Sequence, residues 1–168
     1  VCSSDLMTDA AGNASSASAN EAVAVTYANA SAPEIQSFSA VDSEGAALSN
    51  TSVGLGEALT IKAQMSTALW SGSTFELTVG GETVSMTVSG SDNTVMEGSF
   101  TVPSGLTTEA LSVSAYTTGG NVRGIYGTQM TQSGAISGDG ALSKNSIVVD
   151  TLRPTVLIAM SDAALKVG

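Results

Sequence analysis

Apolar and polar side chains alternate along several short stretches of the chain, and this period of two strongly limits how it can fold. In ALTIKAQM, residues 58–65, the apolar side chains of Leu59, Ile61 and Met65 fall on one face. Lys62 falls on the other face. Successive side chains of a β-strand point to opposite faces, so this pattern predicts a strand with one buried face.

Two further alternating stretches are joined by a pair of glycines. FELTV, residues 75–79, and ETVSMTV, residues 82–88, are separated only by Gly80 and Gly81. Tight hairpin turns need positive φ angles, which glycine adopts without steric cost. We therefore predict a β-hairpin with a two-residue turn at this point.

Short alternating stretches recur about every ten residues, and helical periodicity is almost absent. MEGSFTV and ALSVSAY extend the pattern, and in the second we expect Leu111, Val113 and Ala115 to face inward. This spacing predicts an all-β fold, an antiparallel β-sandwich of seven or eight strands. The residues predicted for its core are Ile61, Leu77, Val79, Met86, Phe100, Leu111 and Val113.

The chain also contains internal repetition. TDAAGN, residues 8–13, precedes the apolar stretch AVAVTY, a joint at Pro33 and the predicted strand EIQSFSAV. YTTGGN, residues 116–121, precedes SIVVDT, a joint at Pro154 and the predicted strand TVLIAM. The two prolines lie 121 residues apart, which sets the length of the repeat.

The phrases VDTLRPTVLIAMSDAALKVG and TDAAGN resemble the junctions of tandem bacterial immunoglobulin-like repeats in large surface adhesins and biofilm-associated proteins. The central repeat departs from that pattern, because Thr117 stands where the preceding repeat has Asp9. About 13 extra residues also separate its Gly-Asn turn from the following proline. We interpret the region around residues 125–145 as an extra hairpin or an exposed loop.

The resemblance implies an immunoglobulin-like sandwich acting as a spacer in an extracellular, secreted or cell-surface adhesin. Its partners would be neighbouring repeats of the same chain, with other domains binding a surface glycan or protein. The resemblance also implies Ca²⁺ at domain junctions, where Asp150 and Asp9 are the candidate ligands. Each has a simpler interpretation: Asp150 caps a turn or pairs with Arg153, and Asp9 forms an Asx turn.

These observations divide the chain into four parts. VCSSDL, residues 1–6, is the translation of a common sequencing-adapter end, and we interpret it as an artefact of an environmental sequence assembly. Residues 7–32 are then the last strands of a preceding repeat, and residues 33–152 are a complete repeat. Residues 153–168 are the first strand of a following repeat, so we expect the chain to be a fragment.

Composition excludes several classes of function. The net charge of −10 argues against binding to nucleic acid, which requires clustered Lys and Arg. The chain has no histidine, which removes the Ser-His-Asp triad and the histidine-based zinc motifs, and we do not expect an enzyme. No apolar stretch approaches the roughly 18 residues of a membrane-spanning helix, so we expect no membrane insertion.

One alternative function comes from a different class. Trp70, Tyr116 and Tyr126 are candidates for a sugar-binding platform, which would make the chain a carbohydrate- or ligand-binding β-sandwich module of a secreted protein. The simpler interpretation of Trp70 is partial burial at an edge of the sandwich.

Overall fold

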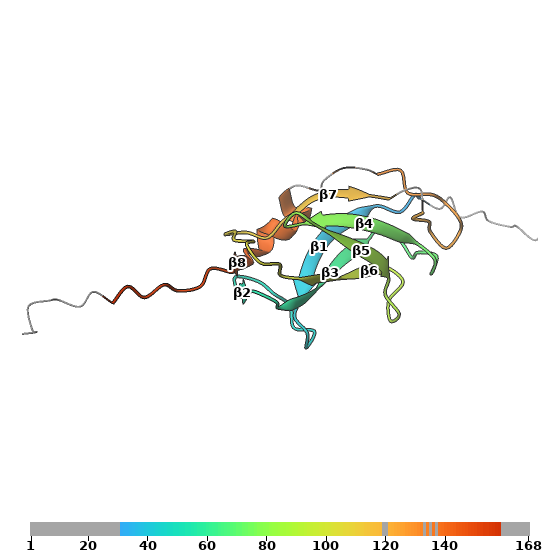
Figure 1. Cartoon of the computed structure of the whole chain (residues 1–168). Coiled ribbons are helices and arrows are strands. Elements are labelled where there is room, and N and C mark those ends of the chain that lie inside the picture. The colour runs from blue at the N-terminus through green and yellow to red at the C-terminus, as the bar shows by residue number, and fades with distance from the viewer. Residues whose placement is uncertain (1–30, 119–120, 133, 135, 137, 159–168) are drawn as a thin grey trace, which may run out of the picture.

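The computed structural model describes residues 31–118, 121–132, 134, 136 and 138–158. This part of the chain is built almost entirely of β-strands, which confirms the predicted all-β class (Figure 1). The strands are β1 (Ile35–Val41), β2 (Ser52–Gly54), β3 (Ala58–Met65), β4 (Thr74–Val79), β5 (Glu82–Val88), β6 (Val95–Thr101), β7 (Val113–Thr117) and β8 (Val148–Asp150). Two short 3-10 helices, η1 (Gly138–Gly140) and η2 (Leu142–Asn145), precede β8.

Six of the strands form one antiparallel sheet in the order β1-β3-β6-β5-β4-β7. The remaining two, β2 and β8, form a small parallel sheet. On its other side β8 joins the chain just before β7, because Thr108 and Val149 exchange backbone hydrogen bonds of 3.0 and 2.8 Å. The last strand is therefore held both by β2 and by the segment that leads into β7.

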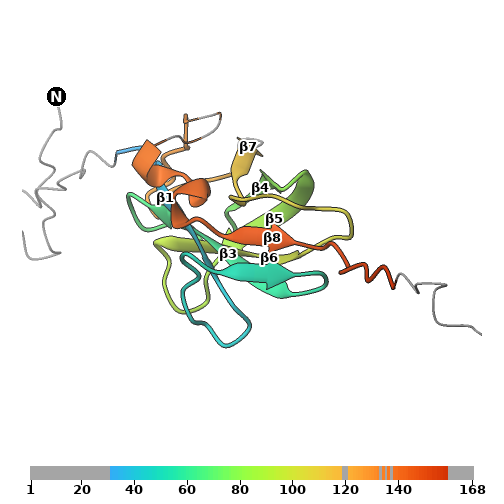
Figure 2. The ribbon, with the colours of Figure 1, turned by 90° about the vertical axis from the view of Figure 1, so that its left-hand side faces the viewer.

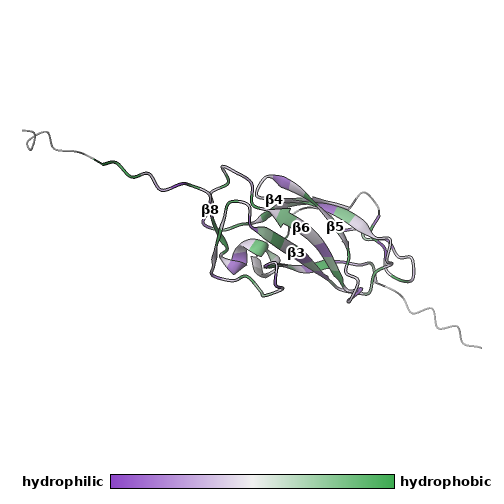
Figure 3. Cartoon of the chain, turned by 60° about the horizontal axis from the view of Figure 1, so that its bottom comes forward, coloured by the Kyte–Doolittle hydropathy of each residue, from purple (hydrophilic) through white to green (hydrophobic). Residues whose placement is uncertain are grey.

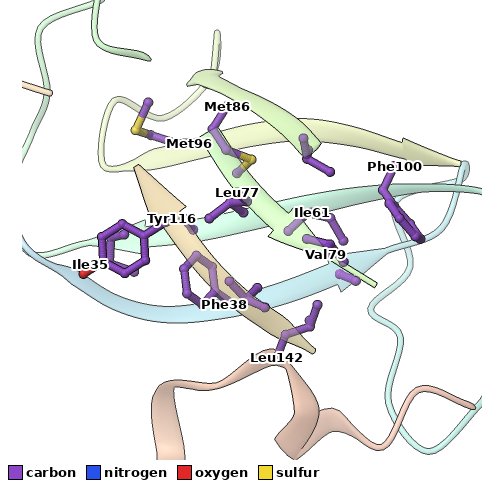
Figure 4. Close-up of a cluster of buried hydrophobic side chains, with 14 of the residues drawn as sticks. Ile35, Phe38, Ile61, Leu77, Val79, Met86, Met96, Phe100, Tyr116 and Leu142 are labelled. Carbon is purple, nitrogen blue, oxygen red and sulfur yellow. The ribbon is translucent and has the colours of Figure 1, made fainter. Parts of the chain in front are cut away.

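The large sheet is curled, and its apolar face encloses the core (Figures 1 and 2). Side chains from β1, β3, β4, β6 and β7 converge there, and Leu142 of η2 lies beside Phe38 in the same cluster (Figure 4). All seven residues predicted for the core are buried, which confirms that part of the prediction: Ile61, Leu77, Val79, Met86, Phe100, Leu111 and Val113.

A β-bulge corrects the predicted orientation of side chains on β7. Thr78 of β4 pairs with Ala115, but the next residue, Val79, pairs with Val113, so Ser114 is an extra residue in the ladder. An extra residue shifts the phase of the inward and outward alternation. As a result Tyr116 is buried together with Val113, whereas Ala115, which the alternation predicted to face inward, is exposed.

The predicted hairpin between β4 and β5 is present. Val79 pairs with Glu82, leaving Gly80 and Gly81 as the two turn residues. Their φ angles are 55° and 89°, both in the region where an L side chain is strained. The Gly-Gly pair therefore sets the register of both strands.

The segment interpreted as an extra hairpin or exposed loop is partly a hairpin and is not simply exposed. Arg123 and Gln129 form a bridge, and the amide of Met130 donates to the carbonyl of Val122 at 2.9 Å. Beyond this turn, Leu142 and Ile147 are fully buried. The segment thus supplies part of the core, which its polar composition did not indicate.

The described chain enters and leaves the fold at opposite ends (Figures 1 and 2). We call the end containing Pro33 and the start of β1 the entry end, and the end containing Asp150 and the segment that follows β8 the exit end. Residues 155–158, part of a predicted strand, form no strand here, and Leu157 is 93% exposed (Figure 3). A strand needs a partner for its backbone groups, and no described strand lies beside this segment. Among the described residues there is no helix with the length and apolar character needed to cross a bilayer.

Candidate functional site

Two turns meet at the entry end of the domain. The first follows β3 and is closed by a hydrogen bond of 2.9 Å from the Ser73 amide to the Trp70 carbonyl. The second lies in the hairpin after β7, where the Gly127 amide donates to the Gly124 carbonyl at 2.9 Å. The first turn carries Trp70 and the second carries Ile125 and Tyr126, so large apolar side chains gather at this end.

The buried side chain of Ser73 links the two turns. Its hydroxyl donates to the carbonyl of Arg123 at 3.1 Å and accepts from the amide of Arg123 at 3.0 Å. The amide of Trp70 donates to the same carbonyl at 2.9 Å. Because Ser73 is fully buried, these hydrogen bonds hold the backbones of Trp70 and Arg123 next to each other without competition from water.

A pocket of about 660 Å³ opens between the two turns. That volume lies within the range of about 300–1,000 Å³ that is typical of small-molecule sites. Three glycines form part of its wall and leave the space open. The lining residues are Trp70, Gly72, Thr74, Asn121, Arg123, Gly124, Ile125 and Gly127.

Of the three aromatic residues proposed as a sugar-binding platform, Trp70 and Tyr126 lie on the two turns of this site and Tyr116 does not. Trp70 and Tyr126 are exposed on the two turns, with 54% and 71% of their surface accessible. Tyr116 instead lies in the core, where its ring packs edge-on against Phe75 with ring centroids 6.3 Å apart. Burial raises the pKa of the Tyr116 hydroxyl. Trp70 is partly buried, as its simpler interpretation predicted, and about half of its surface faces solvent.

Arg123 is the charged residue of this site, and the sequence analysis missed it. Lys62 on β3 forms an ion pair with Glu97 on β6, with the Nζ and Oε1 atoms 3.0 Å apart. Arg123 forms no ion pair with a described carboxylate. The sequence shows Arg123 as a single cation just after the predicted turn at residues 116–121. An analysis of apolar and polar alternation does not consider such a charge.

Asp150, the first of the two proposed calcium ligands, lies exposed at the end of β8. Its Oδ1 accepts a hydrogen bond from the amide of Leu152 at 2.9 Å, so the carboxylate forms the turn that was its simpler interpretation. Arg153 forms no ion pair with it among the described residues. Asp9, the second proposed ligand, lies outside the described residues.

The described residues contain no cluster of acidic side chains around Asp150. Within them no three acidic or thiol side chains converge, and Asp150 contributes one carboxylate, whereas Ca²⁺ takes six to eight oxygen ligands. Junction calcium therefore stays a prediction that needs ligands from elsewhere in the chain.

No family model, curated protein or solved structure matches this chain. The geometry of the domain and the chemistry of its surface are therefore the grounds for any statement about its function.

Proposed function

We propose that the chain is an immunoglobulin-like repeat that acts as a structural spacer in a large extracellular adhesin. On this proposal the domain sets distance and stiffness along a fibre, and other domains of the same protein contact a surface glycan or protein. The role requires a stable fold and two attachment points on opposite ends.

The strand order supports an immunoglobulin-like assignment. In the constant-type immunoglobulin sandwich, strands A, B, E and D form one sheet and strands C, F and G form the other. The run β1-β3-β6-β5 corresponds to A, B, E and D, and β4, β7 and β8 correspond to C, F and G. The difference is that the β4–β5 hairpin joins the two sets into one curled sheet, with β8 bound beside the start of β7.

The observation that carries the spacer role is the position of the two chain connections. Pro33 leads into β1 at the entry end, and the segment after Asp150 leaves from the exit end (Figures 1 and 2). Domains connected in this way extend a chain in one direction, because each new copy begins where the previous one ends. A domain with both connections at one end would fold the chain back instead.

Small-angle X-ray scattering of concatenated domains tests the proposal. Two and three copies of residues 33–154, joined head to tail, should give rods whose maximum dimension increases by a constant amount per copy. The proposal would be contradicted if the maximum dimension rose only slightly with copy number, as it does for compact clusters.

A further inference from the structure

Trp70 occupies an unusual position for the single tryptophan of a chain with few aromatic residues. It is 54% exposed, whereas all three phenylalanines of the chain lie in the core. Its ring lies so close to Gly72 that a Cβ added there would be 2.4 Å from the ring. The indole thus rests against the backbone of Gly72, and solvent reaches much of its remaining surface.

Arg123 supplies a positive charge to the same pocket. No acidic side chain lines this pocket, and the guanidinium has no carboxylate partner among the described residues. The chain as a whole is strongly acidic, but exposed charges farther away than about 8 Å are largely screened at physiological ionic strength. Arg123 is therefore the charged side chain on the wall of this pocket.

We propose that this pocket binds an oligosaccharide whose terminal sugar carries a carboxylate, as in a hexuronate. The faces of a pyranose ring are lined by C–H groups, which pack against the electron-rich face of an indole. A guanidinium binds a carboxylate through two parallel hydrogen bonds. The hydroxyl of Thr74 and the amide of Asn121, both on the pocket wall, suit the sugar hydroxyls.

A carboxylate fits the charge of the site better than a phosphate. One guanidinium balances the single negative charge of a carboxylate, whereas a phosphate monoester carries nearly two at neutral pH. The adjoining hollow of about 320 Å³ shares Thr74 and Asn121 with the pocket and contains the exposed Glu76. That carboxylate disfavours a second anionic group on this side, so the neutral part of the oligosaccharide would extend toward it.

The site is also organised before any ligand arrives. Ser73 fixes the backbone of Arg123 beside Trp70, and Gly72 leaves room for the indole ring to lie against the backbone. A group that is already held in its binding geometry loses less conformational entropy on association. This proposal is independent of the spacer role, and its failure would leave that role untouched.

The test is a pair of titrations of the full chain followed by NMR and calorimetry. One ligand is a disaccharide with a terminal glucuronate, and the other is the matched disaccharide with a terminal glucose. We expect the glucuronate to bind at millimolar concentration or better and the glucose analogue to bind at least about tenfold more weakly. Absence of glucuronate binding at about 10 mM, or equal affinity for both sugars, would overturn the proposal.

Four variants connect binding to the pocket. Trp70→Ala and Arg123→Gln should each weaken glucuronate binding by about tenfold or more, and Gly72→Ala should weaken it by displacing the indole. Arg153→Gln removes the same charge at the exit end and should leave the affinity unchanged. If Arg123→Gln and Arg153→Gln lost glucuronate affinity equally, binding would depend only on net charge, which would contradict the proposal. If Trp70→Ala bound with unchanged affinity, the sugar would not bind in this pocket.

Discussion

Val113 and Ala115 lie two residues apart on β7, yet the first is buried and the second is exposed. The bulge at Ser114 explains this difference, because the extra residue places Val113 and Ala115 on opposite faces of the sheet. At the scale of single residues, stability thus depends on the local ladder as well as on the hydrophobic pattern.

Val113→Asp should destabilise the domain severely, by about 3 kcal/mol or more, because it places an unpaired charge in the core. Ala115→Asp, the matched control on the same strand, should change the free energy of unfolding by less than about 0.5 kcal/mol. Urea denaturation of both variants measures the difference. Equal losses would contradict the bulge.

Asp92 gives a residue-level prediction about pH. Its Oδ1 accepts hydrogen bonds from the Thr94 hydroxyl at 2.7 Å and the Thr94 amide at 2.8 Å, and these lower the pKa of Asp92 from its ordinary value. The resulting stabilisation is present above the unfolded-state pKa and is lost as the pH falls through the lower folded-state value. An NMR titration should show this low pKa, and Thr94→Ala should raise it. An unchanged pKa in that variant would exclude the hydroxyl as the main cause.

At the scale of elements, β5 pairs with β4 from Glu82 to Thr87 but pairs with β6 only at Thr87 and Val88. The regular pairing with β6 stops at Gly98, where β5 lies close to the backbone of β6. A Cβ at Gly98 would lie 2.6 Å from the Met86 sulfur and 2.7 Å from the Ser85 carbonyl oxygen. The absence of a side chain at this position is therefore part of the packing.

Gly98→Ala should destabilise the domain by about 1–3 kcal/mol, because the new methyl group overpacks the core against a backbone atom. Gly90→Ala is the control, since a Cβ at that position meets nothing within 4 Å and its φ is not positive. That variant should be neutral or slightly stabilised, because alanine reduces the entropy of the unfolded chain. Thermal melting of both proteins would count against this packing if Gly98→Ala were the more stable.

At the scale of the whole molecule, the last strand closes the fold. Ile147 and Val149 are fully buried, and β8 pairs with β2, which lies 96 residues earlier in the chain (Val53 pairs with Val149). Residues 153–158 have exposed side chains and take part in no described strand. β8 thus closes the fold, and the exposed residues 153–158 that follow it carry the chain away from the sheets.

A chain ending at Asn145 should be unfolded or nearly so. Losing two buried aliphatic side chains costs about 3–6 kcal/mol, which approaches the total stability of many domains. A chain ending at Leu152 should melt like the full chain, because it keeps β8 and the hydrogen bond from the Thr151 hydroxyl to the Leu106 carbonyl. Circular dichroism melts compare the three proteins. A cooperative, unchanged transition in the shorter chain would show that β8 is dispensable.

The sequence by itself determined the local features of this protein. Period-two alternation identified β3, β4, β5 and most of the core, because each of these strands buries one face. The Gly-Gly pair identified the β4–β5 turn, since its positive φ angles suit few other residues. These are properties of neighbouring residues, and they can be recognised without knowing what the strands pack against.

Only the tertiary structure decided the bulge in β7, the burial of Tyr116, Leu142 and Ile147, and the approach of Trp70 to Arg123. Each depends on residues far apart in the chain: Ser73 reaches Arg123 across 50 residues, and β8 pairs with β2. Sequence patterns report which side chains favour burial, but not which distant segment supplies the partner. The pocket could therefore be described only after two turns, each ordinary on its own, had been placed side by side by the curl of the sheet.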